Sequence, residues 1–261
     1  MSLNALIFDV DGTLADTEET HRQAFNYAFL RSGLGWEWPK ALYRELLMTS
    51  GGQERIGRWI DMIRVSAAEK ARLRKLAPAI HREKTRLYSE LIADGRCPLR
   101  PGIARLLDEA QAEGVRVAIA STSASANTDA LLSRHLGAGA ARMFDVIACA
   151  DHVQQKKPAP DVYLQAMAML GEGAGSCVAF EDSVNGVHAA KAAGLYTVVT
   201  PSPWTIGGDF AEADLELPHL GDPDCALPGE AAAVVGGAWL GLGGLRRLHA
   251  AAGATAEDGR S

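Results

Sequence analysis

A short apolar run near the start of the chain is followed by two carboxylates separated by one residue, Asp9 and Asp11, in the segment FDVDGT. A carboxylate can attack an electrophile and hold the transferred group covalently. A second carboxylate two residues away can protonate the leaving group and later deprotonate water. A solvated turn with a helix N-cap has the same pattern, so this pair alone leaves catalysis and structure equally open.

A second acidic pair, Glu181 and Asp182, ends another apolar run in FEDSVNG and comes directly before a predicted helix. Capping that helix is the structural alternative for this pair. If both acidic pairs meet in one crevice, however, four carboxyl groups need a cation, and hard oxygen ligands suit Mg²⁺. The predicted magnesium ligands are Asp9, Glu181 and Asp182, together with the main-chain carbonyl of Asp11.

Hydroxyl groups and a lysine complete the set of residues that could act on a phosphoryl group. VAIAST ends in Ser121 and Thr122 at a predicted helix start, where hydroxyl and N–H groups can hold a phosphate oxygen. Lys157, in QQKKPAPD, can supply a counter-charge to the transferred group. Alone, each has an ordinary alternative, because Ser and Thr are common N-caps and most lysines are solvated surface charges.

Five apolar runs of strand length could place these residues at one edge of a sheet. They alternate with helical patterns over residues 102–113, 125–136, 160–170 and 184–193, several of which end at glycine. This alternation predicts an α/β fold with a parallel sheet covered on both faces. Open parallel sheets bind ligands at the carboxyl ends of their strands. The predicted strands are 5–9, 115–121, 145–150, 176–182 and 195–200.

The alternation is interrupted between residues 16 and 98, where the pattern predicts helices only. These helices are expected over 17–32, 40–48, 53–63 and 67–93, and Pro78 is expected to start or kink a helix. The stretch is interpreted as an inserted helical cap domain. The predicted domains are a Rossmann-like core (1–15 and 99–221), the cap (16–98) and an Ala/Gly-rich C-terminal extension (222–261).

Composition narrows the classes of partner and the cellular setting. A formal net charge of −6 argues against a broad nucleic-acid surface. Four widely spaced cysteines indicate neither a zinc site nor a disulfide framework and suit a reducing compartment. No secretory signal pattern precedes Asp9, and the apolar segment 231–244 is too short and glycine-rich to span a bilayer. We therefore expect a cytoplasmic protein, a monomer, with a small molecule as partner and neither nucleic acid nor membrane.

The ordered set FDVDGT, AST, KKP and FEDS, each at a predicted strand end, resembles the haloacid dehalogenase superfamily of aspartate-based phosphotransferases. The resemblance covers residues 5–200. The dehalogenase reaction itself is disfavoured, because only a phosphate leaving group requires the second aspartate, Asp11. The resemblance implies these roles: nucleophile Asp9, acid/base Asp11, phosphoryl-binding Ser121 and Lys157, and magnesium ligands Glu181 and Asp182.

Within that superfamily, the helical insert is similar to the cap of the β-phosphoglucomutase-like branch. Four segments resemble the CbbY proteins more closely, and the likeness extends to about residue 215. It implies a phosphatase acting on xylulose 1,5-bisphosphate and an association with carbon fixation. The four segments are TEETHRQAF (17–25), ELLMTSGGQER (45–55), IHREKT (80–85) and LRPGI (99–103).

Five cap residues are candidates for substrate binding. The resemblance implies a substrate or acid/base-orienting role for His21 and places Lys84 toward the site. Gly51 and Gly52 allow a close backbone approach to a ligand, and Arg55 can present a guanidinium to a phosphate. A structural histidine and a solvated helix end are the ordinary alternatives. The neighbouring basic residues are interpreted as surface charges: His81, Arg82 and Arg86.

The sequence thus favours a Mg²⁺-dependent sugar-phosphate phosphatase that forms an aspartyl phosphate and acts on a pentulose bisphosphate. A phosphosugar mutase would use the same residues, because only the access of water to the aspartyl phosphate separates the two reactions. A receiver-like signalling module also combines acids, a hydroxyl and a lysine on a parallel sheet. It carries its phosphoacceptor after a middle strand of the chain, whereas Asp9 follows the first strand and precedes a long insert.

Overall fold

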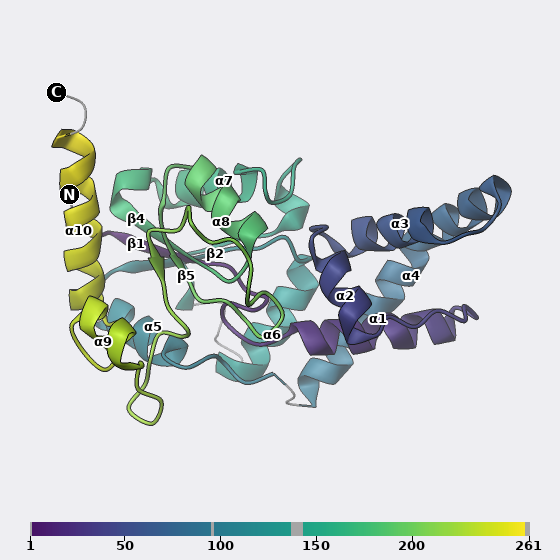
Figure 1. The fold of residues 1–261 in the computed structure, drawn as a ribbon, viewed down its shortest axis with the longest axis horizontal. Coiled ribbons are helices and arrows are strands. Elements are labelled where there is room, and N and C mark those ends of the chain that lie inside the picture. Colours follow the sequence, from purple (N-terminus) through teal and green to yellow (C-terminus); the bar gives the residue numbers. More distant parts are fainter. Residues whose placement is uncertain (1, 95–96, 137–142, 259–261) are drawn as a thin grey trace.

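The computed structural model describes residues 2–94, 97–136 and 143–258, and a six-stranded sheet lies at its centre. The strands have the order β3-β2-β1-β4-β5-β6, and all neighbours pair in parallel (Figure 1). The predicted α/β fold with a parallel sheet is therefore confirmed. The strands are β1 (Ala5–Phe8), β2 (Arg116–Ala120), β3 (Val146–Ala148), β4 (Cys177–Glu181), β5 (Tyr196–Val199) and β6 (Leu215–Glu216).

Helices precede or follow most strands, as the sequence pattern predicts. Strand β6 was not predicted, because two residues at the sheet edge are too short to show a repeating pattern. The α-helices of the core are α5 (Ile103–Ala112), α6 (Ser125–Leu136), α7 (Asp161–Leu170) and α8 (Val184–Ala192), with 3₁₀ turns η2 (Ala150–His152) and η3 (Ala174–Ser176).

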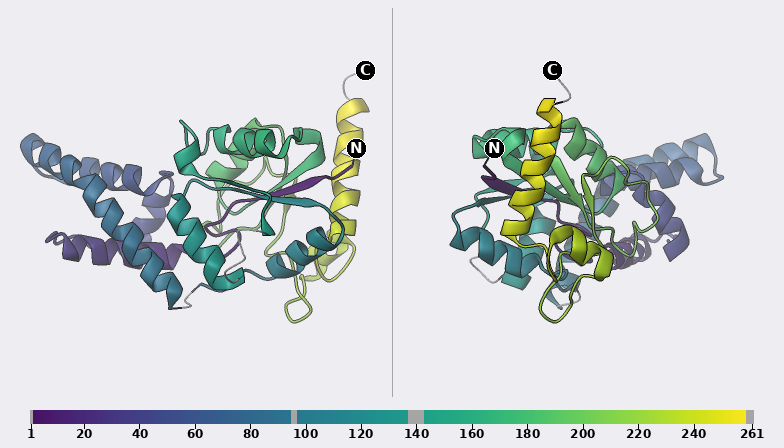
Figure 2. Two further views of the ribbon diagram at one scale, coloured as in Figure 1. Left: turned by 180° about the vertical axis from the view of Figure 1, so that it is seen from behind. Right: turned by 60° about the vertical axis from the view of Figure 1, so that its left-hand side comes forward.

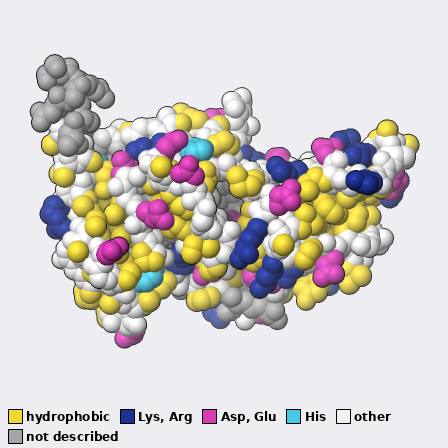
Figure 3. Space-filling model, in the orientation of Figure 1, with side chains coloured by type: hydrophobic (Ala, Val, Ile, Leu, Met, Phe, Trp, Pro, Cys, Tyr) yellow, Lys and Arg dark blue, Asp and Glu magenta, His cyan; other side chains and the backbone are white. Residues whose placement is uncertain are grey.

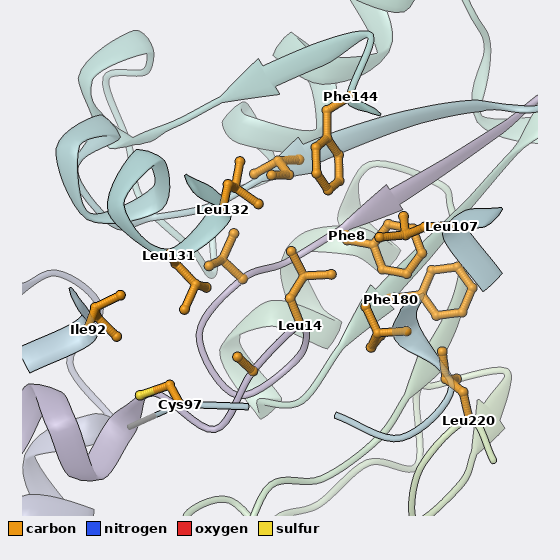
Figure 4. Packing of buried hydrophobic residues seen from close by; sticks show 14 of the residues in the cluster. Phe8, Leu14, Ile92, Cys97, Leu107, Leu131, Leu132, Phe144, Phe180 and Leu220 are labelled. Atoms are coloured by element: carbon orange, nitrogen blue, oxygen red, sulfur yellow. The ribbon is translucent and has the colours of Figure 1, made fainter. Parts of the chain in front are cut away.

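Alternating residues of β1 serve the two faces of the sheet, because successive side chains of a strand point to opposite sides. Ala5 and Ile7 pack in a cluster with residues of α7 and α8, whereas Phe8 packs in a second cluster with residues of α5 and α6. Figures 1 and 2 show these helix pairs on opposite sides of the sheet. The rings of Phe8 and Phe180 stack with centroids 4.4 Å apart, near Leu107 of α5 (Figure 4). Strand β1 is thus buried on both faces of the sheet.

Strand β1 lies between β2 and β4, so the strand order reverses on either side of it. Its last residue, Phe8, is in register with Ile119 of β2 and Phe180 of β4. In open parallel sheets, ligand sites form at this reversal, beyond the carboxyl ends of the strands. The sheet therefore brings the residues that follow β1, β2 and β4 to one place.

Four helices inserted between β1 and α5 form the cap, which lies apart from the sheet in Figure 1. An aromatic cluster holds them together, with Trp38 fully buried between Phe25 and Phe29 at centroid distances of 4.7 and 4.8 Å. Pro78 was expected to start or kink a helix; a start there is wrong, because one helix continues across it, and the kink stays a prediction. The helices are α1 (Glu18–Arg31), α2 (Lys40–Leu47), α3 (Gly52–Met62) and α4 (Ala67–Ala93).

The C-terminal extension contains two helices, α9 (Gly229–Val235) and α10 (Leu242–Asp258), which close one end of the core (Figure 2). The N–H of Leu242 donates to Glu109 Oε2 of α5 at 2.8 Å, and the side chains of Leu242 and Leu245 are fully buried. The extension is therefore part of the packed core. The expected fraying of the last residues concerns 259–261, which lie outside the described residues, and the exact domain bounds stay a prediction.

The surface charge and the cysteines can be compared with what the sequence predicts, which is no broad basic surface and no disulfide framework. On the face drawn in Figure 3, Lys and Arg side chains are interspersed with Asp and Glu, without a large field of either sign. All four cysteines are free; Cys225 is half-buried and the other three are buried. Within the described residues, every helix is too short or too polar to cross a bilayer.

Candidate active site

A cavity of about 470 Å³ lies where the carboxyl ends of the central strands face the cap. This volume is within the range of small-molecule binding sites. The core lines it with residues after β1, β2 and β4, and the cap lines it with residues of α1, α3 and α4. Both charge signs are present: the cations are Arg55, Arg82, Lys84, Lys156 and Lys157, and the acids are Asp9, Asp11, Glu18, Asp151 and Asp182.

Asp9 directly follows β1, and its N–H donates to the carbonyl of Phe180 on β4 at 3.0 Å. This bond continues the pairing of β1 with β4 and fixes the backbone of Asp9, which lines the cavity. Burial raises the pKa of Asp9 to about 7; the charges of Glu181 and Asp11 also raise it, and Lys157 opposes them. The carboxylate thus lacks water and needs cations around it to stay ionised and nucleophilic.

Lys157 supplies one of these cations. Its buried Nζ donates to Asp9 Oδ1 at 2.7 Å, to Glu181 Oε1 at 2.6 Å and to the carbonyl of Ala120 at 2.8 Å. Burial alone would lower the pKa of Lys157, but the two carboxylates hold it above the usual range of a lysine. The hydroxyl of Tyr163 also donates to Glu181 Oε1, at 2.6 Å. The predicted placement of Lys157 beside Asp9 is therefore observed, with its ammonium fixed by three bonds.

Three buried carboxylates could hold a metal ion: Asp9, Glu181 and Asp182 offer ligand atoms within 4.8 Å of one another. Burial, followed by the charges of Asp9 and Glu181, raises the pKa of Asp182 well above its usual value, so the cluster is short of positive charge. Gly12 has φ +88°, and a Cβ there would lie 2.1 Å from Asp182 Oδ2. Only glycine therefore fits beside the cluster, and the all-oxygen donor set suits a hard divalent cation.

Asp11 lies outside this side-chain cluster, and its carboxylate is bound by three other groups. Thr17 Oγ1 donates to Oδ1 at 2.6 Å, His21 Nε2 lies 2.8 Å from the same oxygen, and Ser123 Oγ donates to Oδ2. Burial raises the pKa of Asp11, but His21 and the three hydrogen bonds outweigh burial and hold it well below the usual range. Asp11 is thus ionised and oriented in the ligand-free enzyme.

His21 and Lys84 form a buried chain that ends on Asp11. A carboxylate only accepts, so His21 Nε2 carries the proton, and its Nδ1 accepts from Lys84 Nζ at 2.7 Å. The imidazole stacks on Tyr88 with centroids 4.0 Å apart. Burial lowers the pKa values of both residues, that of Lys84 to about 7. The structure thus joins the two cap residues that the resemblance implied.

The pKa of Lys84 predicts a pH dependence. As the pH rises through about 7, Lys84 loses its positive charge and attracts an anionic substrate less strongly. Because kcat/KM reports the ionisations of the free enzyme, we expect kcat/KM for a sugar phosphate to fall over this interval. Lys84→Met should lower kcat/KM and remove the descent, as measured by pH–rate profiles. Lys70→Met, on the same helix, is the control, and a descent retained in Lys84→Met would contradict the assignment.

Arg55 is buried in the cap and lines the cavity. Its Nη1 donates to the hydroxyl of Tyr43 at 2.9 Å, and that hydroxyl donates to Glu18 Oε2 at 2.7 Å. Among the described residues, Arg55 Nε has no hydrogen-bond partner. A buried donor without a partner is costly, so the guanidinium is suited to an anion that enters from the cavity. The alternative of a solvated helix end is wrong.

Gly51 and Gly52 of the cap line the cavity. The backbone conformation of Gly51 and the packing around Gly52 favour glycine at both positions even without a ligand. Gly51 has φ +92°, a conformation that other residues adopt with strain. A Cβ on Gly52 would lie 2.5 Å from His81 Nε2. The role in ligand approach stays a prediction.

His81 is not the surface charge that the sequence suggested. It lines the cavity, and burial, together with the charges of Lys84 and Lys156, lowers its pKa to about 4, so the imidazole is neutral near pH 7. Arg82 is exposed at the rim of the same cavity, and Arg86 is exposed on the cap surface. The position of each residue on the helix, rather than its type, decides whether its side chain lines the cavity or is exposed on the cap surface.

The hydroxyl residues after β2 are placed differently from one another. Ser121 is buried, and its Oγ accepts the N–H of Ser123 at 3.1 Å. Thr122 and Ser123 line the cavity, whereas Ser121 is not among its lining residues. The phosphate-binding roles predicted for Ser121 and Thr122 stay predictions, and the bond from Ser123 to Asp11 is an addition.

Several residues of the site were missed from the sequence. Thr17 and Ser123 bind Asp11, Tyr163 binds Glu181, and Tyr43 joins Arg55 to Glu18. Ser123 lies two residues beyond Ser121, so the Ser/Thr run after β2 was an available signal. Tyr43 and Tyr163 are single aromatic residues on helices and carried no signal distinguishable from core packing.

A family model described as haloacid dehalogenase-like hydrolase matches residues 3–194. The plasmid CbbY protein of Cupriavidus necator is 49% identical over 249 residues, covering 95% of this chain and 97% of the relative, and so includes part of the C-terminal extension. The CbbY protein of Rhodobacter capsulatus is 50% identical over 220 residues, covering 84% and 95%. A crystal structure of mutant CbbY from Rhodobacter sphaeroides in complex with xylulose-(1,5)-bisphosphate has a TM-score of 0.77 and 44% identity, covering 83% of this chain and 94% of that one. The chain therefore belongs to the haloacid dehalogenase-like hydrolase family, as a CbbY-like phosphatase.

Proposed function

We propose that this enzyme is a Mg²⁺-dependent phosphatase of sugar bisphosphates, acting on a pentulose bisphosphate such as xylulose 1,5-bisphosphate. The observation that carries the proposal is the buried Arg55, whose Nε lacks a partner among the described residues and which shares one cavity with the Asp9–Lys157 pair. A monophosphatase needs no second anion site. The related CbbY crystallised with xylulose-(1,5)-bisphosphate supports the choice of sugar.

In the proposed reaction, Asp9 Oδ attacks the phosphorus of one phosphate, forming the Asp9–phosphate bond while the bond to the sugar oxygen breaks. Lys157 and a magnesium ion would neutralise charge on the transferred group. Asp11 would give a proton to the departing sugar oxygen and later take one from the water that hydrolyses the aspartyl phosphate. Asp11 is ionised in the free enzyme, so the entering phosphate dianion must raise its pKa for the first step.

The distal phosphate would bind in the cap, where Arg55 and Lys84 supply positive charge and hydrogen-bond donors. Charge-assisted bonds of a guanidinium to phosphate are among the stronger polar contacts. If the remote phosphate also stabilises the closed cap, part of its binding energy aligns Asp9 and excludes water. The loss of Arg55 would then lower kcat as well as affinity.

This role of Arg55 predicts a substrate-selective loss. Arg55→Gln should reduce kcat/KM for the pentulose bisphosphate by roughly 2 kcal/mol or more, about 30-fold, the scale of a charged hydrogen bond. Hydrolysis of para-nitrophenyl phosphate, which has no second phosphate, should be nearly unchanged. Steady-state assays of both substrates provide the test, with Arg58→Gln on the same helix as control. Equal losses on both substrates would mean that Arg55 only supports the cap fold.

The carboxylate cluster of Asp9, Glu181 and Asp182 would hold the Mg²⁺, with the main-chain carbonyl of Asp11 as a further proposed ligand. EDTA should abolish activity and Mg²⁺ should restore it. Because burial raises the pKa values of Asp9 and Asp182, protons compete with the metal. The Mg²⁺ concentration for half-activation should therefore rise as the pH falls below about 7.

Titration of activity with Mg²⁺ at several pH values measures this dependence. Asp182→Ala should raise the requirement strongly, and the exposed Glu212→Gln should leave it unchanged. Activity that survives exhaustive chelation would exclude the proposed metal site.

We further propose that the reaction takes place in the cytoplasm of a carbon-fixing cell and that the enzyme acts as a monomer on a small sugar phosphate. Four free cysteines, three of them buried, support a reducing compartment. The CbbY relatives support the sugar-phosphate partner.

A further inference from the structure

The loop of residues 201–208, which follows β5, extends from the core to the cap. Its base is anchored by the buried Arg100, which donates to the carbonyl of Pro201 at 3.0 Å and to the carbonyl of Gly12 at 2.5 Å. Ser202 and Thr205 close a tight turn, with the Ser202 N–H donating to Thr205 Oγ1 at 2.8 Å. The loop is thus fixed to the same backbone segment that carries Asp9 and Asp11.

At its tip, Trp204 contacts two consecutive residues of cap helix α2. The guanidinium of Arg44 lies over the indole, 5.5 Å from the ring centroid, and its Nη2 donates to the carbonyl of Pro203 at 3.2 Å. The ring of Tyr43 meets the indole edge-on, with centroids 5.5 Å apart. Cation–π and edge-to-face aromatic contacts of this kind are both favourable, so they hold the indole against α2.

On both its core side and its cap side, this loop is connected to residues of the candidate active site. On the core side, Thr205 Oγ1 donates to Asp182 Oδ2 at 3.2 Å. On the cap side, the hydroxyl of Tyr43 accepts from Arg55 and donates to Glu18, both of which line the cavity. Trp204 therefore connects the loop that binds Asp182 through Thr205 to the cap residue Tyr43, which binds Arg55 and Glu18.

Other contacts also join core and cap around the cavity, among them the bonds of Thr17 and His21 to Asp11. Lys156 Nζ pairs with Glu54 Oε1 at 2.6 Å, and Asn185 Nδ2 donates to the carbonyl of Met48 at 3.1 Å. Neither contact includes a residue that binds Asp182 in the described part of the chain. The Trp204 contact differs from both because its loop reaches the carboxylate cluster and the cap at once.

We propose that Trp204 is a positioning residue that couples the closed cap to the orientation of the Asp182 carboxylate. Thr205 transmits the coupling on the core side, and Tyr43 with Arg44 transmits it on the cap side. When the cap opens, the indole loses both cap partners, and the turn that holds Thr205 against Asp182 loses its support. The site is then complete only over a closed cap. The proposal rests on the proposed function only for the choice of the bisphosphate substrate.

The contact can be tested from both sides with a double-mutant cycle. Trp204→Leu and Arg44→Gln should each lower kcat/KM for the pentulose bisphosphate by about tenfold, within the usual range of coupling between sites. The double variant should be no worse than the poorer single variant, because both changes remove one shared contact. Trp204→Phe, which keeps an aromatic face, should retain most of the activity. Ile206→Ala, exposed on the same loop, is the control and should behave as wild type.

A readout independent of activity is hydrogen–deuterium exchange in the presence of Mg²⁺ and without substrate. Trp204→Leu should speed exchange in cap residues 40–50 and also in residues 180–186 around Asp182. Arg44→Gln should speed exchange in the same two segments. Because it changes only an exposed side chain, it provides the test even if the Trp204 variant folds poorly. Melting temperatures of all variants confirm that each is folded.

Three results would overturn the proposal: multiplicative losses in the double variant, faster exchange confined to residues 201–208, or a Trp204→Phe enzyme as impaired as Trp204→Leu. Failure of the wild type to hydrolyse the bisphosphate would instead reject the proposed function. The exchange pattern would still decide whether Trp204 couples the cap to Asp182, so the two failures are distinguishable.

Discussion

Replacing Asp9 by Asn should reduce turnover of every phosphate ester by more than about 10⁴-fold, the scale of removing the nucleophile of a covalent mechanism. An amide cannot form the aspartyl phosphate. The substitution keeps the shape of the side chain, and Lys157 retains its bonds to Glu181 and to the carbonyl of Ala120. The fold should therefore survive. Steady-state assays on a sugar phosphate and on para-nitrophenyl phosphate measure the loss.

Asp9 is also a proposed metal ligand, so lost activity alone does not separate the two roles. Acid quenching of the working wild-type enzyme, followed by borohydride reduction, should convert an aspartyl phosphate at position 9 to homoserine, which peptide mass spectrometry detects. Asp9→Asn should show no such product. Residual activity above a few percent in Asp9→Asn would reject the covalent mechanism.

Replacing Asp11 by Asn should lower turnover by roughly 10²–10⁴-fold, as expected for lost general acid/base catalysis. The amide cannot exchange a proton with the leaving group, although its oxygen can still accept from Thr17 and His21. The loss should be larger for a sugar phosphate than for para-nitrophenyl phosphate in the first half-reaction, because para-nitrophenolate departs with little protonation. Single-turnover kinetics on both substrates isolate this step.

Asp16→Asn is the matched control for Asp11, because Asp16 is a nearby carboxylate that is exposed and outside the cavity lining. It should leave both rates close to wild type. Equal losses on the two leaving groups in Asp11→Asn would contradict the acid/base assignment and would favour a purely structural role for the residue.

The core and its acidic cluster were predictable because they depend on local patterns. Each central strand is a short apolar run, and the residues after β1 and β4 are polar, so parallel pairing alone brings Asp9 and Asp182 together. Lys157 was predicted from its position before a helix and from the family resemblance. In the structure its Nζ donates to Asp9 Oδ1, and its catalytic role stays a prediction.

Contacts between distant segments could not be predicted in the same way. His21 and Lys84 are 63 positions apart, and only the packing of α1 on α4 shows that they hydrogen-bond. Trp204 follows a strand of the core and Arg44 lies on a cap helix, and the alternation of strands and helices along the sequence gives no sign that they are in contact. The packing of α10 on α5 likewise depends on tertiary contacts, so an Ala/Gly-rich composition suggested only an extension.

The enzyme is proposed to hydrolyse one phosphate of a sugar bisphosphate, with water as the final acceptor. The most direct test is ³¹P NMR of the wild-type enzyme with Mg²⁺ and xylulose 1,5-bisphosphate. The proposed function predicts one equivalent of inorganic phosphate and one of a pentulose monophosphate, with no isomerised phosphate ester. Transfer of the phosphoryl group to another sugar hydroxyl, without release of inorganic phosphate, would identify a mutase and contradict it.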